Sequence, residues 1–355
     1  MAQDRSSMSL RAVVVTVLVT AFSACGAPPS PPSQPTSAPP SRSASSSAPP
    51  SATPGTPASA SPSVPTATMT LADLHAATLA YAVCADQQCD VHVVDTTGRD
   101  RNVTNTPGAG TEEHQPDLSP DGSRIAFRCP HDPALVGDSD NDDICRINLD
   151  GSGRTNLTNN EVADYSTSWS SDGRRIAFAS VRGSTPGNPN DIYVMSADGR
   201  NVVRITSSVG IDEYPVWSRD GSLIAFSCTD GGMHESGVGD FEVCLVRPDG
   251  SNRRRITETP GICDPTGWSP DGRSLLYTCD PDGNGDAAHD VYVLKDGVST
   301  RLTTTGGYGA KFTPDGGAVI YKDRDGFLWD LTPGGGRARI DVPPFEGDWD
   351  LAFRG

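Results

Sequence analysis

A short segment recurs five times along the chain and constrains the fold more than any other feature of the sequence. In its clearest copy, Ser218-Arg219-Asp220-Gly221 runs into the apolar segment Leu223-Ile224-Ala225-Phe226. Every copy pairs an Asp-Gly turn with an apolar run, and the five turns contain Gly122, Gly173, Gly221, Gly272 and Gly316. Self-similarity at intervals of 44 to 51 residues is typical of a propeller or a solenoid.

Each repeat contains four extended pieces, which in this copy cover residues 214–217, 223–227, 241–246 and 254–257. The pieces are rich in β-branched and aromatic residues, and two tight Asp-Gly turns lie between them. In such a turn Asp accepts hydrogen bonds from the backbone, and Gly takes the conformation with positive φ. Four short antiparallel strands per repeat form the blade of a propeller, so we expect an all-β fold.

The number of blades follows from the end of the fourth strand, which recurs six times. Its copies are Val103-Thr104, Leu157-Thr158, Ile205-Thr206, Ile256-Thr257, Leu302-Thr303 and the degenerate Ile340-Asp341. First strands precede only five Asp-Gly turns, whereas the unmatched segment 348–353 ends the chain. We therefore predict a six-bladed β-propeller whose C-terminal strand completes the first blade and removes two sheet edges.

The repeats resemble the TolB-type, WD40-like β-propeller repeat over about residues 75–355. The matching segments are Trp268-Ser-Pro-Asp-Gly272, Ile-Ala-Phe, Ile192-Tyr-Val-Met195 and the closing Asp-Gly and Leu-Thr pairs. The resemblance implies the fold. TolB itself carries an additional α/β domain before its propeller, and in some proteins such repeats precede a peptidase domain. This sequence resembles neither domain, so the resemblance does not imply the role of TolB or a peptidase activity.

The segment before the propeller is predicted to export and anchor the protein. Arg5 and Arg11 flank the start of the apolar run 12–22, which is too short to span a bilayer. Residues 23–25 resemble a bacterial lipoprotein cleavage box, which implies residues 1–25 as signal peptide and lipidation of Cys25; an ordinary secretory signal is the alternative. Residues 26–68 contain 13 Pro and 12 Ser, and are predicted to be a disordered linker before a propeller of residues 69–355.

Acidic residues dominate the chain, whose net charge is −17. The first 68 residues carry +2, which leaves −19 for the propeller. This charge argues against nucleic acid as a partner and against direct docking on anionic lipid, so membrane contact would be through the N-terminal lipid only. It suits a cation or a basic partner, and solubility of an exported protein is the plainer explanation.

Nine cysteines, one of them Cys25, leave an even number for the propeller, as in exported proteins with disulfides. The repeat pairs them: two pairs occupy equivalent places on strands two and three, one pair faces across strands one and two, and one brackets a short loop. The predicted disulfides are Cys84–Cys89, Cys129–Cys145, Cys228–Cys244 and Cys263–Cys279. Blade three has Ser180 and Tyr193 at the places of the repeated pair. A cysteine metal site is the weaker alternative, because the chain has no Cys-x-x-Cys.

Two sets of residues are candidate sites on the face that carries the longer loops. Trp169, Trp217 and Trp268 recur at one position of strand one. The first set lies just upstream of this position, where it would ring the central channel and bind a sugar or a peptide: His114, Tyr165, Tyr214, Asp264 and Tyr308. The second has the oxygen spacing of a calcium loop and consists of Asp280, Asp282, Asn284, Asp286 and the neighbouring Asp290. Loop packing and a solvated turn are the respective alternatives.

Catalysis has little support in the sequence. The chain contains neither a Gly-x-Ser-x-Gly elbow nor a His-Glu-x-x-His motif, and its best acid–base cluster is His114 with Glu112 and Glu113. We therefore expect a lipid-anchored binding module of the bacterial cell envelope, with an envelope protein, glycan or peptide as its ligand. The alternative is a hydrolase or lyase, with or without a metal ion, that acts on an envelope or extracellular polymer.

Overall fold

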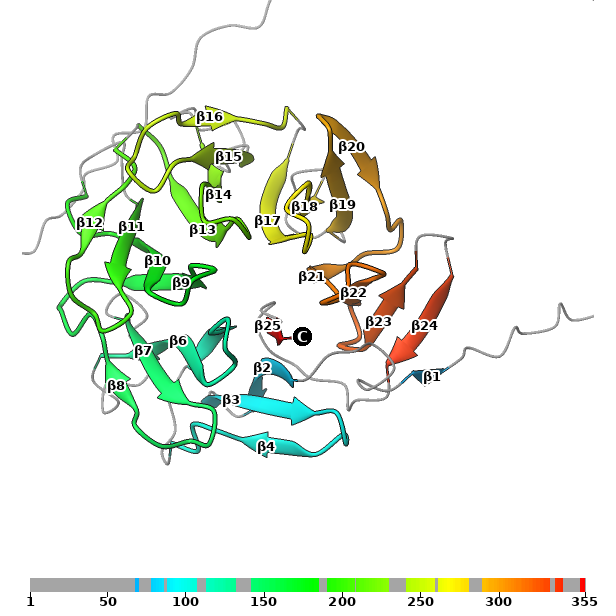
Figure 1. Cartoon of the computed structure of the whole chain (residues 1–355), viewed down its shortest axis with the longest axis horizontal. Coiled ribbons are helices and arrows are strands. Elements are labelled where there is room, and N and C mark those ends of the chain that lie inside the picture. The colour runs from blue at the N-terminus through cyan, green and yellow to red at the C-terminus, as the bar shows by residue number, and fades with distance from the viewer. Residues whose placement is uncertain are drawn as a thin grey trace, which may run out of the picture. The chain divides into compact units, whose positions relative to one another are not determined.

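The structure is a computed structural model whose compact folded unit spans Ser63–Gly355. It describes residues 68–69, 78–85, 88–106, 113–131, 142–184, 190–207, 209–229, 241–258, 261–280, 289–332, 336–340 and 352–354. These residues form six separate sheets that follow one another around a ring (Figure 1). The prediction of a six-bladed, all-β propeller is confirmed.

The first three blades follow in chain order, apart from the strand that closes the ring. Blade one consists of β25 (Ala352–Arg354), β2 (Thr78–Ala85), β3 (Gln88–Asp95) and β4 (Asp100–Asn102). Blade two consists of β5 (His114–Leu118), β6 (Arg124–Pro130), β7 (Asp142–Asn148) and β8 (Thr155–Asn156). Blade three consists of β9 (Asp164–Trp169), β10 (Arg175–Ser180), β11 (Asp191–Ser196) and β12 (Val203–Arg204).

The last three blades repeat the same order of strands. Blade four consists of β13 (Asp212–Trp217), β14 (Ile224–Cys228), β15 (Glu242–Val246) and β16 (Arg254–Arg255). Blade five consists of β17 (Ile262–Trp268), β18 (Ser274–Asp280), β19 (Asp290–Lys295) and β20 (Val298–Arg301). Blade six consists of β21 (Tyr308–Phe312), β22 (Val319–Lys322), β23 (Leu328–Leu331) and β24 (Arg337–Ile340). In blades two to six the first strand lies nearest the ring centre (Figure 1).

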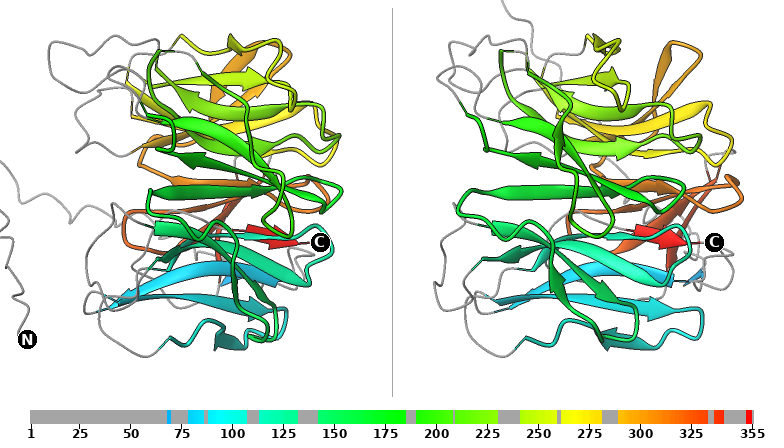
Figure 2. Two further views of the ribbon diagram at one scale, coloured as in Figure 1. Left: turned by 90° about the vertical axis from the view of Figure 1, so that its left-hand side faces the viewer. Right: turned by 60° about the vertical axis from the view of Figure 1, so that its left-hand side comes forward.

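The two ends of the propeller sequence join the ring at neighbouring blades. β25 pairs antiparallel with β2, with Ala352 opposite Ala80, and takes the innermost place in blade one (Figures 1 and 2). This pairing confirms that the C-terminal strand completes the first blade. β1 (Thr68–Met69) pairs parallel with β24, so blade six gains a fifth strand from the segment where the linker was predicted to end.

The repeated Asp-Gly turn is held by its own side chains. In blade two the Ser119 hydroxyl donates to Asp121 Oδ1 (2.6 Å), which also accepts the backbone N–H of Ser123 (3.0 Å). The N–H of Arg124 donates back to Ser119 Oγ (3.0 Å), and Gly122 has φ of 62°. Blades three to six repeat the hydroxyl–carboxylate contact at their own turns. The Ser-x-Asp-Gly pattern therefore encodes a closed local network that fixes the register of strands one and two.

A second repeated network explains the Thr of the Leu-Thr motif. In blade three Thr206 Oγ1 accepts the N–H of Ile192 (2.9 Å) and donates to the carboxylate of Asp191 (3.2 Å). The N–H contact recurs in four other blades at 2.8–3.0 Å, from Val91, Ile144, Val243 and Val291. Because strand four is only two residues long in several blades, this Thr–acid pair extends its attachment to strand three.

In blades three to five the Trp of the first strand contacts the preceding blade. Trp169 donates its backbone N–H to Asp117 Oδ2 (2.6 Å) and its indole N–H to the Asp117 carbonyl (3.1 Å). The indole of Trp268 donates likewise to the Val216 carbonyl (3.3 Å). These residues therefore pack between blades, and apolar clusters fill the interfaces between neighbouring blades.

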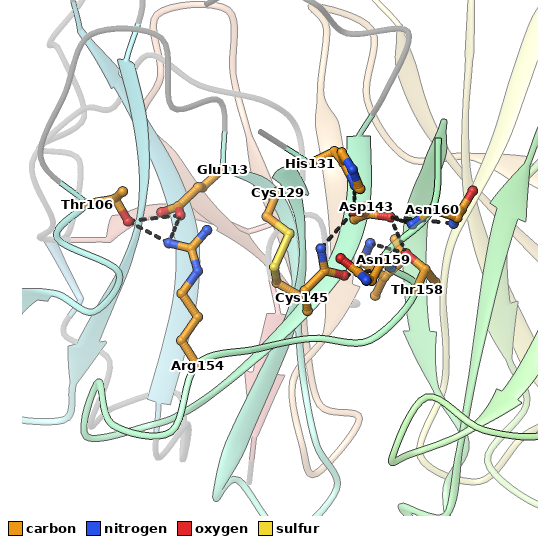
Figure 3. Close-up of a disulfide and its surroundings, with 12 residues drawn as sticks. Thr106, Glu113, Cys129, His131, Asp143, Cys145, Arg154, Thr158, Asn159 and Asn160 are labelled. Carbon is orange, nitrogen blue, oxygen red and sulfur yellow. Dashed lines mark hydrogen bonds and ion pairs between the residues drawn. A yellow bond between two sulfur atoms is a disulfide. The ribbon is translucent and has the colours of Figure 1, made fainter. Parts of the chain in front are cut away.

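All four predicted disulfides are present, and Figure 3 shows Cys129–Cys145 beside the Thr–acid pair of Thr158 and Asp143. Blade three uses a different device at that place. Arg182 pairs with buried Asp164, donates to Ser180 Oγ (2.9 Å), and accepts Tyr193 OH at its carbonyl (2.5 Å). The arginine thus links the two strands that a disulfide links in blades two and four.

Candidate functional site

The innermost strands share an irregularity near the start of the strand. In blades two to six the pairing of strands one and two shifts register there. Three non-glycine residues at this place have positive φ, and they are Gln115 (54°), Ser166 (57°) and Tyr214 (49°). A β-bulge re-aims the side chains around it, and a bulky residue such as Tyr adopts positive φ rarely. The bulges therefore set which side chains face the centre of the ring.

A cavity of about 790 Å³ lies among these inner strands. Residues of β5, β9, β13, β17 and β21 line it, which makes it the central channel of the ring (Figure 1). Its acidic, basic and histidine lining residues are Asp117, Arg128, Arg219, Asp264, His289 and Lys311. The volume is large enough for a peptide segment or a small sugar, and the lining is mixed polar and aromatic, as in ligand sites generally.

Two of the five predicted channel residues line this cavity. Tyr214 is 37% exposed, and Asp264 is partly buried. The other three contact protein instead. His114 is buried with Nδ1 3.9 Å from Cys84 Sγ, the Tyr165 hydroxyl donates to Glu213 Oε1 (3.0 Å), and the Tyr308 ring lies 5.4 Å from the His289 ring. The cavity is thus lined by only two of the five residues that were predicted to ring the channel mouth.

The strand pairing also shows that, in blade four, a different residue occupies the place equivalent to the other members of that ring. Tyr165, Asp264 and Tyr308 pair with Ala179, Thr278 and Lys322 on the second strand of their blades. In blade four the residue that pairs at this level is Glu213, opposite Ser227, and Tyr214 follows it in the bulge. Counting four residues back from Trp217 would have found Glu213, whose carboxyl the sequence reasoning missed.

Glu213 and Asp264 occupy equivalent places on neighbouring blades, and each accepts hydrogen bonds from the preceding blade. Ser227 Oγ donates to Asp264 Oδ1 (2.6 Å), whereas Tyr165 and Asn190 donate to Glu213 Oε1. Burial raises the pKa of Asp264 to about 6, and the negative charge of Glu213 adds to the rise. Burial also raises the pKa of Glu213, against the lowering effect of its two donors.

The basic residues of the cavity have partners of their own. Arg128 forms a salt bridge with Asp142, and Lys311 Nζ donates to the Thr266 carbonyl. The positive charges of Lys311 and Arg219 both lower the pKa of Asp117, but burial raises it by more. His289 has its pKa lowered by burial, so its ring is neutral near pH 7.

The predicted calcium loop is described only at its ends. Asp280 is buried, whereas Asp282, Asn284 and Asp286 lie outside the described residues. Asp290 belongs to the Thr–acid pair of blade five, where it accepts Thr303 Oγ1 (3.0 Å) and forms a salt bridge with Arg301. The position of Asp290 is therefore explained by the repeat, and calcium binding stays a prediction.

One group of potential metal ligands occurs within the described residues, and it consists of Cys84, Cys89 and His114. One ligand atom of each lies within 4.8 Å of the others. The two sulfur atoms form a disulfide, however, so neither is a thiolate. In the oxidised protein this cluster cannot bind a metal ion as a Cys-Cys-His site, which agrees with the weaker standing of that alternative.

The acid–base cluster is explained in part by an ion pair. Glu113 is fully buried and forms a salt bridge with Arg154 (2.5 Å), to which Thr106 is also hydrogen-bonded (Figure 3). Glu112, the predicted signal peptide with Cys25 and most of the predicted linker lie outside the described residues. Within the described part of the chain, no helix is long and apolar enough to cross a membrane.

Comparison with known proteins gives the fold a reference. The chain superposes on the crystal structure of TolB from Acinetobacter baumannii with a TM-score of 0.61 and 21% identity, over 78% of this chain and 66% of that one. The propeller has the fold of the part of TolB on which it superposes. At this identity the likeness to TolB concerns the fold alone, which the repeated motifs had predicted.

Two further proteins are similar to this chain, one with a lower TM-score and the other over a short segment only. An oligogalacturonate lyase in complex with manganese superposes with a TM-score of 0.51 and 18% identity, over 79% of each chain. Dipeptidyl-peptidase 5 from Porphyromonas gingivalis is 37% identical over 68 residues, which are 19% of this chain. The chain thus spans only 10% of the length of that curated relative. No family model matches the sequence.

Proposed function

We propose that the protein is a lipid-anchored, extracytoplasmic binding module of the cell envelope whose central channel holds its ligand. The observation that carries this proposal is the cavity of about 790 Å³ inside the ring, onto which the bulged inner strand presents Tyr214. Tyrosine side chains that remain exposed in a concave site supply contact area at low entropic cost and are enriched in binding sites. The ligand would be a peptide or glycan segment of an envelope component.

The location outside the cytoplasm rests on the four disulfides, since thiols are kept reduced in the bacterial cytoplasm. The lipid anchor rests on the cleavage-box resemblance that ends at Cys25. The Pro- and Ser-rich segment after it would act as an extended tether between the membrane and the propeller.

Affinity capture tests the binding role. The oxidised full chain is immobilised, and an envelope extract is passed over it beside two variants, Tyr214→Ala in the cavity and Val203→Ser on the outer strand β12. Val203 is 56% exposed and lies outside the cavity lining, so it controls for loss of an exposed apolar side chain. The proposal expects one saturable component that the wild type and Val203→Ser retain and Tyr214→Ala loses. Equal retention by all three proteins would contradict it.

An enzyme is the second candidate, and Asp264 is the observation that favours it. A carboxyl with a pKa raised to about 6 in a cavity can donate or accept a proton near neutral pH. The oligogalacturonate lyase with the same fold makes an acidic polysaccharide a reasonable first substrate. Release of unsaturated ends from polygalacturonate with added Mn²⁺, abolished by Asp264→Asn, would support the enzyme; no release would leave the binding role as the better account.

A further inference from the structure

We propose that the channel recognises an organic ammonium group, such as a lysine side chain or a peptide amino terminus, at the junction of blades four and five. The group would lie against the carboxylate of Asp264 and the ring of Tyr214. This inference rests on the proposed binding function and names the chemical class of its ligand.

The first step is the charge balance of the cavity wall. Asp264 accepts one hydrogen bond from a neutral hydroxyl, and no Arg or Lys of the described residues contributes to its pKa. The groups that hydrogen-bond Glu213, behind it, are the neutral Tyr165 and Asn190. A carboxylate in a partly dehydrated place without a cation gains more from an incoming cation than a solvated carboxylate does.

The cationic side chains of the cavity interact with groups other than Asp264. Arg128 pairs with Asp142, Lys311 bonds the Thr266 carbonyl, and Arg219 acts with Lys311 on Asp117. His289, the remaining titratable residue of the lining, is neutral near pH 7 because burial lowers its pKa. Of the two carboxylates that line the cavity, Asp117 thus has two cations acting on its pKa, whereas no cation of the described residues acts on the pKa of Asp264.

An aromatic side chain lines the same cavity from the neighbouring inner strand. Tyr214 lies on β13, which packs against β17 with Asp264, and both residues line the same cavity. A cation near an aromatic face is attracted by the ring quadrupole, and the attraction adds to that of a carboxylate. The propeller's net charge of −19 would also attract a cationic ligand from a distance.

Fluorescence anisotropy with a tri-lysine peptide labelled at its C-terminus tests the inference on the oxidised full chain. One peptide is acetylated on the ε-amines and a second on the α-amine, so the two arms separate the side-chain source from the amino-terminal source. The variant is Asp264→Asn. Its matched control is Asp249→Asn, which removes the same charge from an exposed turn outside the cavity lining.

Asp264→Asn should weaken binding of the lysine peptide about tenfold, the usual range for a charge-assisted contact, and Asp249→Asn should change it less than about twofold. Acetylation of the amine that binds should weaken binding by a similar factor. Between pH 7.5 and pH 5 the wild type should lose about tenfold in affinity as Asp264 gains its proton, whereas Asp264→Asn should not.

Equal affinity for the free peptide and for a third peptide, acetylated on both the α-amine and the ε-amines, would overturn the inference, as would an unchanged affinity in Asp264→Asn. Tight binding of a tri-glutamate peptide, lost in Tyr214→Ala, would overturn the ammonium ligand and leave the channel as a binding site. If none of these peptides binds, the ammonium inference fails, and envelope capture by the wild type and Tyr214→Ala then decides the proposed function separately.

Discussion

Among single residues, Asp264 matters most for the proposed function, and the effect of its raised pKa on the free energy of unfolding can be measured. Its folded pKa of about 6 lies above the usual value of 3.8, so the folded protein binds the proton more strongly than the unfolded chain does. For an acid shifted in this direction, the free energy of unfolding falls as pH rises from about 4 to about 6. Residues kept at a cost to stability are typical of functional sites.

We therefore predict that Asp264→Asn raises the free energy of unfolding at pH 7.5 by up to about 3 kcal/mol and changes it little at pH 4. Urea denaturation at the two pH values measures this. Asp121→Asn is the opposite case, because hydrogen bonds from Ser119 and Ser123 lower the pKa of Asp121 to about 2. That substitution should destabilise at pH 7.5, with the effect disappearing as pH falls from about 4 to about 2; equal behaviour of the two variants would contradict the assignment.

The channel residues show what sequence reasoning can reach at this scale. Tyr214 and Asp264 were found because the first strand of every repeat is easily aligned. The sequence also contains the signal for Glu213, which lies four residues before Trp217, the same distance that separates Asp264 from Trp268. The pKa of Asp264 could not be predicted, because its cause is burial by a neighbouring blade.

At the level of elements, each blade is held by a short list of repeated polar contacts. Thr206 is 3% exposed and satisfies both the N–H of Ile192 and the carboxylate of Asp191. Thr206→Val keeps the shape of the side chain but leaves both groups without this partner. Unsatisfied buried polar groups are expensive, so the cost should be about 2–3 kcal/mol.

The check is chemical denaturation together with amide exchange at Ile192, which should become faster in Thr206→Val. Thr206→Ser keeps the hydroxyl, and it should recover most of the lost stability. A valine variant as stable as the serine variant would show that the Thr–acid pair does not support strand four.

Blade three gives a second prediction at this scale, because Arg182 stands where neighbouring blades have a disulfide. Arg182→Ala removes the ion-pair partner of fully buried Asp164, the side-chain hydrogen bond to Ser180 and the guanidinium that lies over the Tyr193 ring. The loss should be about 3 kcal/mol, close to that of Cys129→Ala/Cys145→Ala in blade two. Differential scanning calorimetry of both variants compares them, and an unchanged melting temperature for Arg182→Ala would refute the equivalence.

At the scale of the whole molecule, the ring depends on one strand from the far end of the chain. β25 supplies the innermost strand of blade one, and it also lies near β5 of blade two. A chain that ends at residue 351 should expose the edge of β2, melt at a lower temperature and exchange amides faster in β2 and β3. A chain that ends at Arg354 is the control; if both chains melt together, β25 does not close the ring.

The architecture was predictable from the sequence because each repeat is one blade and carries its own turn chemistry. The same repetition paired the cysteines, since Cys228 and Cys244 occupy the places of Cys129 and Cys145. The cavity was not predictable in the same way. It lies where five inner strands meet, and its volume and charge depend on side chains that differ from blade to blade.

The most direct test of the account is site-specific photo-crosslinking in the intact cell envelope. A photoreactive phenylalanine analogue replaces Tyr214 in the cavity or, as a control, Val203 on the outer strand. The account predicts a discrete adduct from position 214 that is absent from position 203. An adduct from position 203 alone, or none from either position, would contradict a ligand site in the central channel.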